Sequence, residues 1–401
     1  MKILLLTQVL PYPPDSGPKV KTWNVIKYLA PRHEVTLVSF VRGDQSAEVA
    51  HLASVCRAVH TVPMERSLTH DGLAAAQSLF SGQPWMMVRD RRGAMTALLH
   101  RLAASEQFDI VHADQLNMAQ YALQVPAARH ILDAHNALWV LYGRLAAQMK
   151  QGPQRLMLER DWRLLKRYEG QMVAAMDGVL AVSEEDRSAL LMAAGRPHDI
   201  TVIPIAVDTD EIAPVQRHAD ADHLLHVGTM YWPPNIDGIN WFLDEIMPII
   251  VRQRPGTVFD VVGARPPESL LARAQEDHHL NITGYVADTL PYLQSAGVFL
   301  VPLRAGGGMR VKILNALAQG MPIVSTTIGA EGIAVRDGEH LLLADDPADF
   351  AAAVLRVLHD PALATRLGAA GRRLAEEQYD YRVACAPMDT LYQRCLAGRA
   401  L

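Results

Sequence analysis

The chain has 401 residues, half of them hydrophobic and a fifth charged, which is the usual composition of a soluble globular protein. Single hydrophobic cores stop growing near ~250–300 residues, so this length predicts two domains. Nucleic-acid-binding proteins are normally basic, whereas the net charge here is −5, so we expect no nucleic-acid partner.

The sequence predicts no leader and no membrane-spanning segment. The apolar run at residues 3–6 is too short for the core of a signal peptide and is typical of a buried first strand. The three cysteines match no zinc or redox spacing, which indicates free thiols in a reducing compartment. We therefore expect a cytoplasmic protein.

Short apolar segments alternate with helical patterns along the whole chain. In the first half the predicted strands are residues 3–7, 34–40, 58–62, 110–112, 131–133, 178–182 and 201–203, with helices that include 21–29 and 93–104. In the second half the predicted strands are residues 224–228, 258–263, 281–283, 298–301, 323–325 and 341–344, with helices that include 236–251, 309–318 and 347–359. This alternation predicts an α/β protein with two doubly wound parallel sheets.

A stretch rich in Pro, Asp and Ala, without apolar periodicity, predicts the boundary between the two domains. We expect a first domain at residues 1–205, a linker at 206–222 and a second domain at 223–385. The alanine-rich stretch 362–377 predicts a helix. A closing helix is expected at 386–401, and packing of this helix back on the first domain is left open. Parallel sheets bind ligands beyond the carboxyl ends of their strands, so we expect the two domains to face each other across a cleft.

The most informative segment follows the predicted strand 298–301. Three glycines, Gly306, Gly307 and Gly308, precede a predicted helix whose first turn contains Arg310 and Lys312. Cations are normally unfavourable at the start of a helix, and a bound phosphate would account for them. Arg can fork onto phosphate oxygens and Lys adds a point charge. A glycine-rich loop with two solvated cations is the alternative.

This segment resembles the donor site of glycosyltransferase family 4, which has the GT-B fold of two Rossmann-like domains. The pattern Gly-Gly-Gly-x-Arg-x-Lys, followed by Gly320-Met321-Pro322 and an apolar strand, is similar to the exopolysaccharide-associated branch. Further similar segments lie around Gly17, in Ser183–Asp186 of the sequence, and around Gly228 and Thr229. The resemblance implies a retaining transferase of the hexosyltransferase type that uses a nucleoside diphosphate sugar, with UDP favoured.

The sequence departs from the family at the Glu-x7-Glu motif, which falls on Gly307 and Asn315. The second glutamate of the family usually binds the donor ribose. Asn315 can still accept and donate hydrogen bonds but lacks the charge. We also find no Arg or Lys just after the first strand of the second domain, so Arg310 and Lys312 are expected to supply that charge.

A histidine follows the predicted strand 131–133. The resemblance places the active-site histidine of the first domain at His135, where it would hydrogen-bond the transferred sugar. A loop histidine satisfied by Asp133 is the alternative. His112 and Asp114 end the preceding strand in the same way, and they are candidates for the acceptor side, with a structural role open for His112.

The resemblance also implies the remaining donor-binding candidates, which are Gly17, Gly228, Thr229, Gly263, Tyr285, Val286, Met309 and Glu331 beside the glycine loop. For Gly263 an ordinary turn glycine is the alternative, and for Glu331 an ordinary surface glutamate. We find no Asp-x-Asp motif and predict no metal and no cofactor, since the two cations would neutralise the departing phosphate.

The expected partners are a nucleotide sugar and a saccharide or lipid-linked acceptor. Basic residues between Lys150 and Arg167 leave open a peripheral contact at the inner face of the membrane. Two alternatives to a transferase remain. One is a GT-B epimerase or phosphorylase, and the other is a degenerate, non-catalytic partner that only binds nucleotide sugar.

Overall fold

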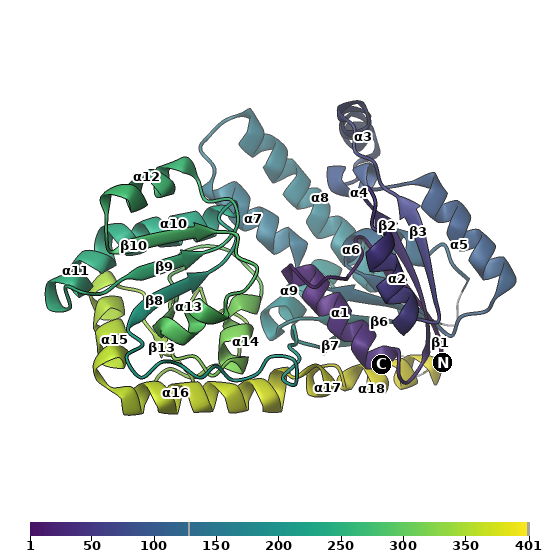
Figure 1. Cartoon of the computed structure of the whole chain (residues 1–401). Coiled ribbons are helices and arrows are strands. Elements are labelled where there is room, and N and C mark those ends of the chain that lie inside the picture. The colour runs from purple at the N-terminus through teal and green to yellow at the C-terminus, as the bar shows by residue number, and fades with distance from the viewer. Residues whose placement is uncertain (127–128, 399–401) are drawn as a thin grey trace. The chain divides into compact units, whose positions relative to one another are not determined.

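The computed structural model describes residues 1–126 and 129–398 (Figure 1). The described chain divides into two compact units. Unit 1 contains Met1–Ala206 together with the C-terminal segment from Ala384, and unit 2 is Val207–Val383. Each unit is built around its own parallel sheet, which confirms the predicted α/β class with two doubly wound domains.

The sheet of unit 1 has seven strands in the order β3-β2-β1-β4-β5-β6-β7, and all neighbouring pairs are parallel. The chain winds outward from β1 in one direction and returns to β4 on its other side, so the switch point lies between β1 and β4. The strands are β1 (Lys2–Thr7), β2 (Glu34–Val41), β3 (Ala58–Pro63), β4 (Ile110–Asp114), β5 (Arg129–Ala134), β6 (Gly178–Ala181) and β7 (Ile200–Val202).

Helices connect these strands, and one more returns from the end of the chain. They are α1 (Gly17–Leu29), α2 (Ser46–Val55), α3 (Leu68–Ser81), α4 (Trp85–Arg89), α5 (Gly93–Ser105), α6 (Leu116–Ala122), α7 (Leu138–Gln148), α8 (Pro153–Ala175), α9 (Glu184–Ala194) and α18 (Pro387–Leu396). Helix α18 packs on β6 and β7, and Asp389 accepts a hydrogen bond from Tyr28 Oη at 2.6 Å. The segment after unit 2 therefore completes the core of unit 1.

The sheet of unit 2 has six parallel strands in the order β10-β9-β8-β11-β12-β13, so its switch point lies between β8 and β11. The strands are β8 (His223–Val227), β9 (Phe259–Val262), β10 (Leu280–Gly284), β11 (Ala296–Val301), β12 (Ile323–Ser325) and β13 (Leu342–Leu343). The helices are α10 (Pro233–Trp241), α11 (Met247–Gln253), α12 (Glu268–Glu276), α13 (Leu290–Ser295), α14 (Val311–Ala318), α15 (Pro347–His359) and α16 (Pro361–Leu374), and α17 (Tyr381–Ala384) lies at the junction of the units.

The helix predicted at residues 236–251 is divided into three pieces. A π-helical turn, Phe242–Ile246, separates α10 from α11. Pro248 has no N–H to continue the α-helical ladder and its ring crowds the preceding turn, and the wider turn accommodates both effects. A second π-helical turn, Ala375–Tyr379, likewise ends the helix predicted at residues 362–377.

Of residues 206–222, which we predicted as a linker, Ala206 belongs to unit 1 and residues 207–222 belong to unit 2. Val207 forms a parallel bridge with Asp380, and Thr209 Oγ1 donates to Asp380 Oδ2 at 2.6 Å. Both ends of unit 2 therefore lie together at one bridge. Within the described residues, none of the helices combines the length and apolarity needed to cross a bilayer.

Candidate functional site

The predicted donor residues of unit 2 gather where β8 and β11 end. Gly228 and Thr229 follow β8, and the glycine loop that leads into α14 follows β11. These two strands flank the switch point, where the connections diverge and leave room for a ligand beyond the carboxyl ends. The topology therefore places the glycine loop at the position where this class of sheet binds its ligands.

Arg310 precedes α14 rather than lying in its first turn. Gly306 and Gly308 have positive φ values of 126° and 75°, so the chain becomes helical only at Val311. The prediction that Arg310 lies in the first turn of this helix is therefore wrong. Arg310 Nη1 instead donates to the carbonyl oxygens of Gly307 and Gly308, the latter at 2.6 Å. The guanidinium is thereby fixed against the glycine loop.

Lys312 lies in the first turn of α14, and its ammonium is held by two side chains. The Nζ atom is 3.0 Å from His226 Nε2 and 3.0 Å from Asn235 Oδ1. Burial, and secondarily the positive charge of Arg310, lowers the pKa of Lys312 to about 7. An anion beside this ammonium would favour its charged form.

Two glycines at this edge are closely packed within the protein itself. A Cβ on Gly228 would lie 2.5 Å from Lys312 Nζ, and a Cβ on Gly263 would lie 1.8 Å from the Gly228 carbonyl oxygen. We predicted both glycines as donor-binding residues from the resemblance to the family. The structure gives a different reason for each, which is contact with Lys312 for Gly228 and contact with Gly228 for Gly263.

The other donor candidates of unit 2 follow neighbouring strands at the same edge of the sheet. Tyr285 and Val286 come after β10, and Tyr285 is 79% exposed. Glu331 is half-buried in the loop after β12. Met309 is buried in the glycine loop, and Asn315 is half-buried in α14. Because all strands are parallel, every one of these loops emerges at the carboxyl edge that carries Lys312.

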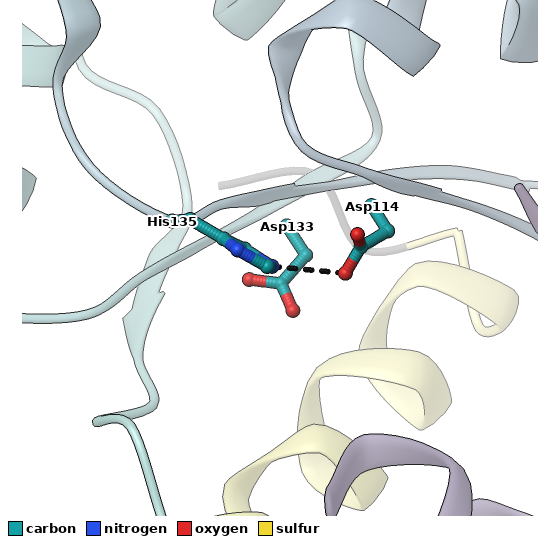
Figure 2. A group of neighbouring side chains, drawn as sticks. All are labelled: Asp114, Asp133 and His135. Atoms are coloured by element: carbon teal, nitrogen blue, oxygen red, sulfur yellow. Dashed lines mark hydrogen bonds and ion pairs between the residues drawn. The ribbon is translucent and has the colours of Figure 1, made fainter. Parts of the chain in front are cut away.

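In unit 1, His135 follows β5 and is held by the end of the neighbouring strand β4. Its Nε2 atom lies 2.9 Å from Asp114 Oδ1, as Figure 2 shows. The same carboxylate oxygen accepts a hydrogen bond from Thr22 of α1 at 2.9 Å. The partner of His135 is therefore Asp114 and not Asp133, which we had named as the alternative. Gly17 begins the same helix α1.

Behind His135 lies a buried polar network. Lys21 forms an ion pair with Asp133, and both side chains are at most 2% exposed. Burial alone would raise the pKa of Asp133, but the Lys21 ammonium overrides this and holds that pKa well below its usual range. His112 is fully buried, and its Nδ1 lies 2.6 Å from Tyr392 Oη of α18. The network places His112 in the core, in the structural role that we had left open.

The ligand-capable atoms of Asp114, Asp133 and His135 all lie within 4.8 Å of one another. This spacing alone would suit a metal ion. However, the Lys21 ammonium already neutralises Asp133, and His135 is engaged with Asp114. A second cation beside the ammonium would be repelled, so these residues fit a network that orients His135 better than a metal site.

Comparison with known families decides the class of the chain. The model described as "Glycosyltransferase Family 4" matches residues 16–211, and the model described as "Glycosyl transferases group 1" matches residues 221–360. The chain belongs to glycosyltransferase family 4. The predicted resemblance is confirmed, and the glycine loop and the Lys312 cluster lie inside the second match.

Relatives and solved structures agree with this glycosyltransferase assignment. A protein from the cps region of Klebsiella pneumoniae is 22% identical over 87% of this chain and 89% of its own length. A GDP-mannose-dependent phosphatidylinositol monomannoside mannosyltransferase of Mycolicibacterium smegmatis is 29% identical over 56% of this chain and 63% of that enzyme. The structure of Anabaena Alr3699/HepE in complex with UDP superposes with a TM-score of 0.65 at 15% identity, covering 98% of this chain and 100% of that one, which shows the shared GT-B fold.

Sequence reasoning about this glycosyltransferase missed the residues that hold the predicted ones. They are Lys21 and Thr22 in unit 1, and His226 and Asn235 in unit 2. One signal was available, since His226 interrupts the apolar run Leu224-Leu225-x-Val227 and a buried polar side chain requires a partner. The others lie on helices whose polar residues look solvent-exposed in the sequence.

A hollow of about 560 Å³ in unit 2 of the glycosyltransferase lies away from these residues. It is lined by Asp222, Gly297 and Gly320, which stand at the amino-terminal ends of β8, β11 and β12. None of the predicted donor residues lines it. The chemistry of the carboxyl edge, rather than the size of this hollow, identifies the candidate site.

Proposed function

We propose that the chain transfers a hexose from a nucleoside diphosphate sugar, with retention of configuration and without a metal ion. The observation that carries this proposal is the Lys312 ammonium at the switch point of unit 2, beside the glycine loop and Arg310. A glycine-rich turn at the carboxyl end of a strand accepts a phosphate closely. Two cations beside it supply the charge that a diphosphate would neutralise.

The chemistry follows from where charge develops during transfer. As the bond to the sugar breaks, negative charge builds on the departing diphosphate. Lys312, Arg310 and the N–H groups at the start of α14 are fixed before the reaction, so they stabilise this charge without reorganising. In unit 1, His135 is oriented by Asp114 through its Nε2 atom and would hydrogen-bond the transferred sugar.

We propose UDP as the first donor nucleotide to test and GDP as the second. The GT-B neighbour from Anabaena is described in complex with UDP, and the mycobacterial relative is named for GDP-mannose. The relative from a cps region supports a saccharide acceptor and a place in polysaccharide assembly. A lipid-linked acceptor fits the name of the mycobacterial relative equally well.

The test is a thermal-shift panel of UDP-, GDP-, ADP- and dTDP-sugars, followed by nucleotide release with and without acceptor extracts. We expect Arg310→Ala to weaken donor binding about ten- to a hundredfold, which is the effect of losing a charge-assisted hydrogen bond worth ~1.5–3 kcal/mol. Arg304→Ala is the matched control, because Arg304 lies in the same loop but pairs with the exposed Asp237.

His135→Ala should keep donor binding and lose turnover. Donor binding without nucleotide release under any acceptor condition would favour the non-catalytic partner. Conversion of the sugar without release would favour an epimerase. Unchanged donor affinity in Arg310→Ala, with unchanged turnover in His135→Ala, would refute the proposed roles of these residues.

We also propose a peripheral contact between unit 1 and anionic lipid. Helix α3 exposes Leu68, Leu73, Leu79 and Phe80, which are 65–92% exposed, while Ala74 and Ser78 on its other face are buried. Helix α8 adjoins it through Arg160, whose Nη2 donates to the Ser78 carbonyl at 2.6 Å. Arg160 is thereby engaged within the protein, whereas Arg163 and Arg167 of the same predicted basic run are exposed. Exposed apolar side chains on α3, together with exposed arginines on the adjoining α8, suit the surface of an anionic bilayer.

A further inference from the structure

The Lys312 ammonium occupies an unusual environment that its own helix does not explain. It lies in the first turn of α14, near the guanidinium of Arg310, where both the helix dipole and the like charge disfavour a cation. A flexible lysine would normally turn away into solvent. Here the ammonium instead points across to β8 and α10, so the residues that hold it there are part of the site.

His226 holds the ammonium as a hydrogen-bond acceptor. The Nδ1 atom of His226 is 2.9 Å from the carbonyl oxygen of Leu300, which can only accept, so Nδ1 carries the proton. The Nε2 atom then presents a lone pair, and it lies 3.0 Å from Lys312 Nζ, which in its ammonium form can only donate. His226 is fully buried, and burial, followed by the charge of Lys312, lowers the pKa of His226 well below its usual range. The ring is therefore neutral and keeps this single tautomer.

Asn235 holds the ammonium from the other side. Its Nδ2 donates to the carbonyl oxygen of Thr229 at 2.7 Å, which leaves Oδ1 to accept from Lys312 Nζ at 3.0 Å. Helix α10 comes this close because Gly238 has no side chain. A Cβ there would lie only 2.3 Å from the Pro302 carbonyl oxygen. Asn235 therefore connects the loop after β8 to the lysine of α14.

An ammonium group has three N–H donors, and two of them are used by His226 and Asn235. The ammonium is pressed against the backbone of Gly228, where a side chain would collide with Nζ. Within the described part of the chain, no acceptor is recorded for the third donor. A lysine fixed in this way offers one directed N–H and one charge to a ligand at the end of β8.

We propose that His226 and Asn235 are positioning residues that hold the Lys312 ammonium in place for an anionic ligand at Gly228. This inference rests on the proposed function, in which that ligand is the donor diphosphate. It adds that the orientation of the charge is set by β8 and α10, and that binding is coupled to proton uptake. The groups that face Lys312 are His226 of β8, Asn235 of α10 and Arg310 before α14.

Two substitutions of one residue separate positioning from folding. In His226→Asn the amide lies near the place of Nδ1, so it can keep the bond to Leu300 but cannot reach Lys312. In His226→Gln the longer amide places its oxygen near Nε2 and can still accept from the ammonium. We expect His226→Gln to bind UDP within about threefold of the wild type and His226→Asn to bind it about tenfold more weakly, a difference of ~1.4 kcal/mol. Asn235→Ala should also weaken UDP binding, and Lys312→Met should weaken UDP binding more than any of these variants.

The pH dependence gives a readout that a purely structural role would not change. A neutral acceptor at 3.0 Å stabilises the charged lysine, so its loss in His226→Asn should lower the pKa of Lys312 further. UDP affinity should then begin to fall at a lower pH in His226→Asn than in His226→Gln or the wild type. Calorimetry of full-length protein in buffers of different ionisation enthalpy should show proton uptake on UDP binding near pH 8, and none in Lys312→Met.

A second measurement needs no nucleotide. NMR titration of protein labelled with ¹³C at lysine Cε, with Lys312→Met to identify the signal, reports the ionisation of Lys312 in the free protein. Equal Lys312 titrations in His226→Asn and His226→Gln would overturn the positioning role even if UDP binds. If the titrations differ as expected but no nucleotide binds, the positioning stands and the proposed donor fails.

Discussion

At the scale of single residues, the loop that carries His135 is fixed by the carboxyl groups of Glu169, which is buried, and Asp186, which is half-buried. Glu169 accepts hydrogen bonds from the backbone N–H groups of Leu138 and Trp139, each at 3.1 Å, at the start of α7. Asp186 accepts from the N–H of Ala137 at 2.7 Å. Three consecutive N–H groups just after His135 are therefore satisfied by side chains from α8 and α9. The start of α7 is defined by these distant carboxylates rather than by a local capping residue.

Glu169 makes the stability of unit 1 depend on pH. Burial, opposed by the two N–H groups and supported by the charge of Asp186, raises the pKa of Glu169 from 4.5 to about 8. Between these values the folded state keeps a proton that the unfolded chain releases, so stability from this residue is full below pH 4.5 and is lost as pH rises toward 8. The slope is about 1.4 kcal/mol per pH unit where the two states differ by one proton.

Glu169→Gln should remove that slope. The amide cannot titrate, and it can accept from only one of the two N–H groups, so we expect a cost of ~1–3 kcal/mol at pH 5. The wild type should lose its advantage over the variant as pH rises to 8, as measured by urea unfolding at several pH values. Glu276→Gln, on the exposed end of α12, serves as the control and should follow the wild-type curve. A constant difference between wild type and Glu169→Gln across this range would contradict the buried, protonated state.

At the scale of elements, sequence patterns located the strands well because each parallel strand is buried on both faces. The run Ile3 to Leu6 is fully buried and has no polar residue to blur it. Helix ends were less predictable. The start of α14 depends on the positive φ of Gly306 and Gly308, and the break between α10 and α11 depends on how the chain accommodates Pro248. Neither is visible in hydrophobic periodicity.

The same reasoning explains which site residues could be found. Gly308, Arg310 and Lys312 adjoin in sequence, so a local motif reveals them. His226 and Asn235 reach Lys312 from 86 and 77 residues away, and Asp114 reaches His135 from another strand. Such contacts exist only because parallel strands bring their carboxyl ends to one edge, which a local pattern does not encode.

The exposed face of α3 leads to a prediction at this scale. Full-length protein should co-sediment with vesicles containing phosphatidylglycerol more than with pure phosphatidylcholine, and added salt should weaken the binding. Burying one Leu or Phe side chain is worth ~1.5–3 kcal/mol, so Leu73→Ser with Phe80→Ser should reduce binding at least tenfold. Leu271→Ser on α12 of unit 2, where Leu271 is 39% exposed, is the matched control. Equal vesicle binding by the wild type and by the Leu73→Ser, Phe80→Ser double variant would contradict the assignment of this face of α3 to lipid binding.

At the scale of the whole molecule, the two units differ in whether one continuous segment of the chain forms them. Unit 2 is one continuous segment whose ends meet, because Val207 N–H donates to Tyr379 O at 2.8 Å and Tyr381 N–H donates to Val207 O at 2.9 Å. Its core cluster contains residues of unit 2 alone. Unit 1 is discontinuous, since Tyr392 and Leu391 of α18 are fully buried in it. Unit 2 therefore has the anatomy of an independent domain, whereas residues 1–206 lack a part of their core.

A fragment of residues 207–383 should therefore fold alone and keep the donor binding that we propose. At a hundredfold excess over Kd, a ligand stabilises the folded state by ~2.7 kcal/mol, which for a domain of this size raises Tm by roughly 5–10 °C. We expect this rise with the nucleotide that stabilises the full-length chain, no rise in the same fragment with Lys312→Met, and no sugar transfer by the fragment.

A fragment of residues 1–206 should be unstable, because removing α18 exposes apolar surface on β6 and β7 and leaves His112 Nδ1 without Tyr392. Circular dichroism and calorimetric melting of both fragments check these outcomes, and an unfolded 207–383 fragment would show that unit 2 is not an independent domain.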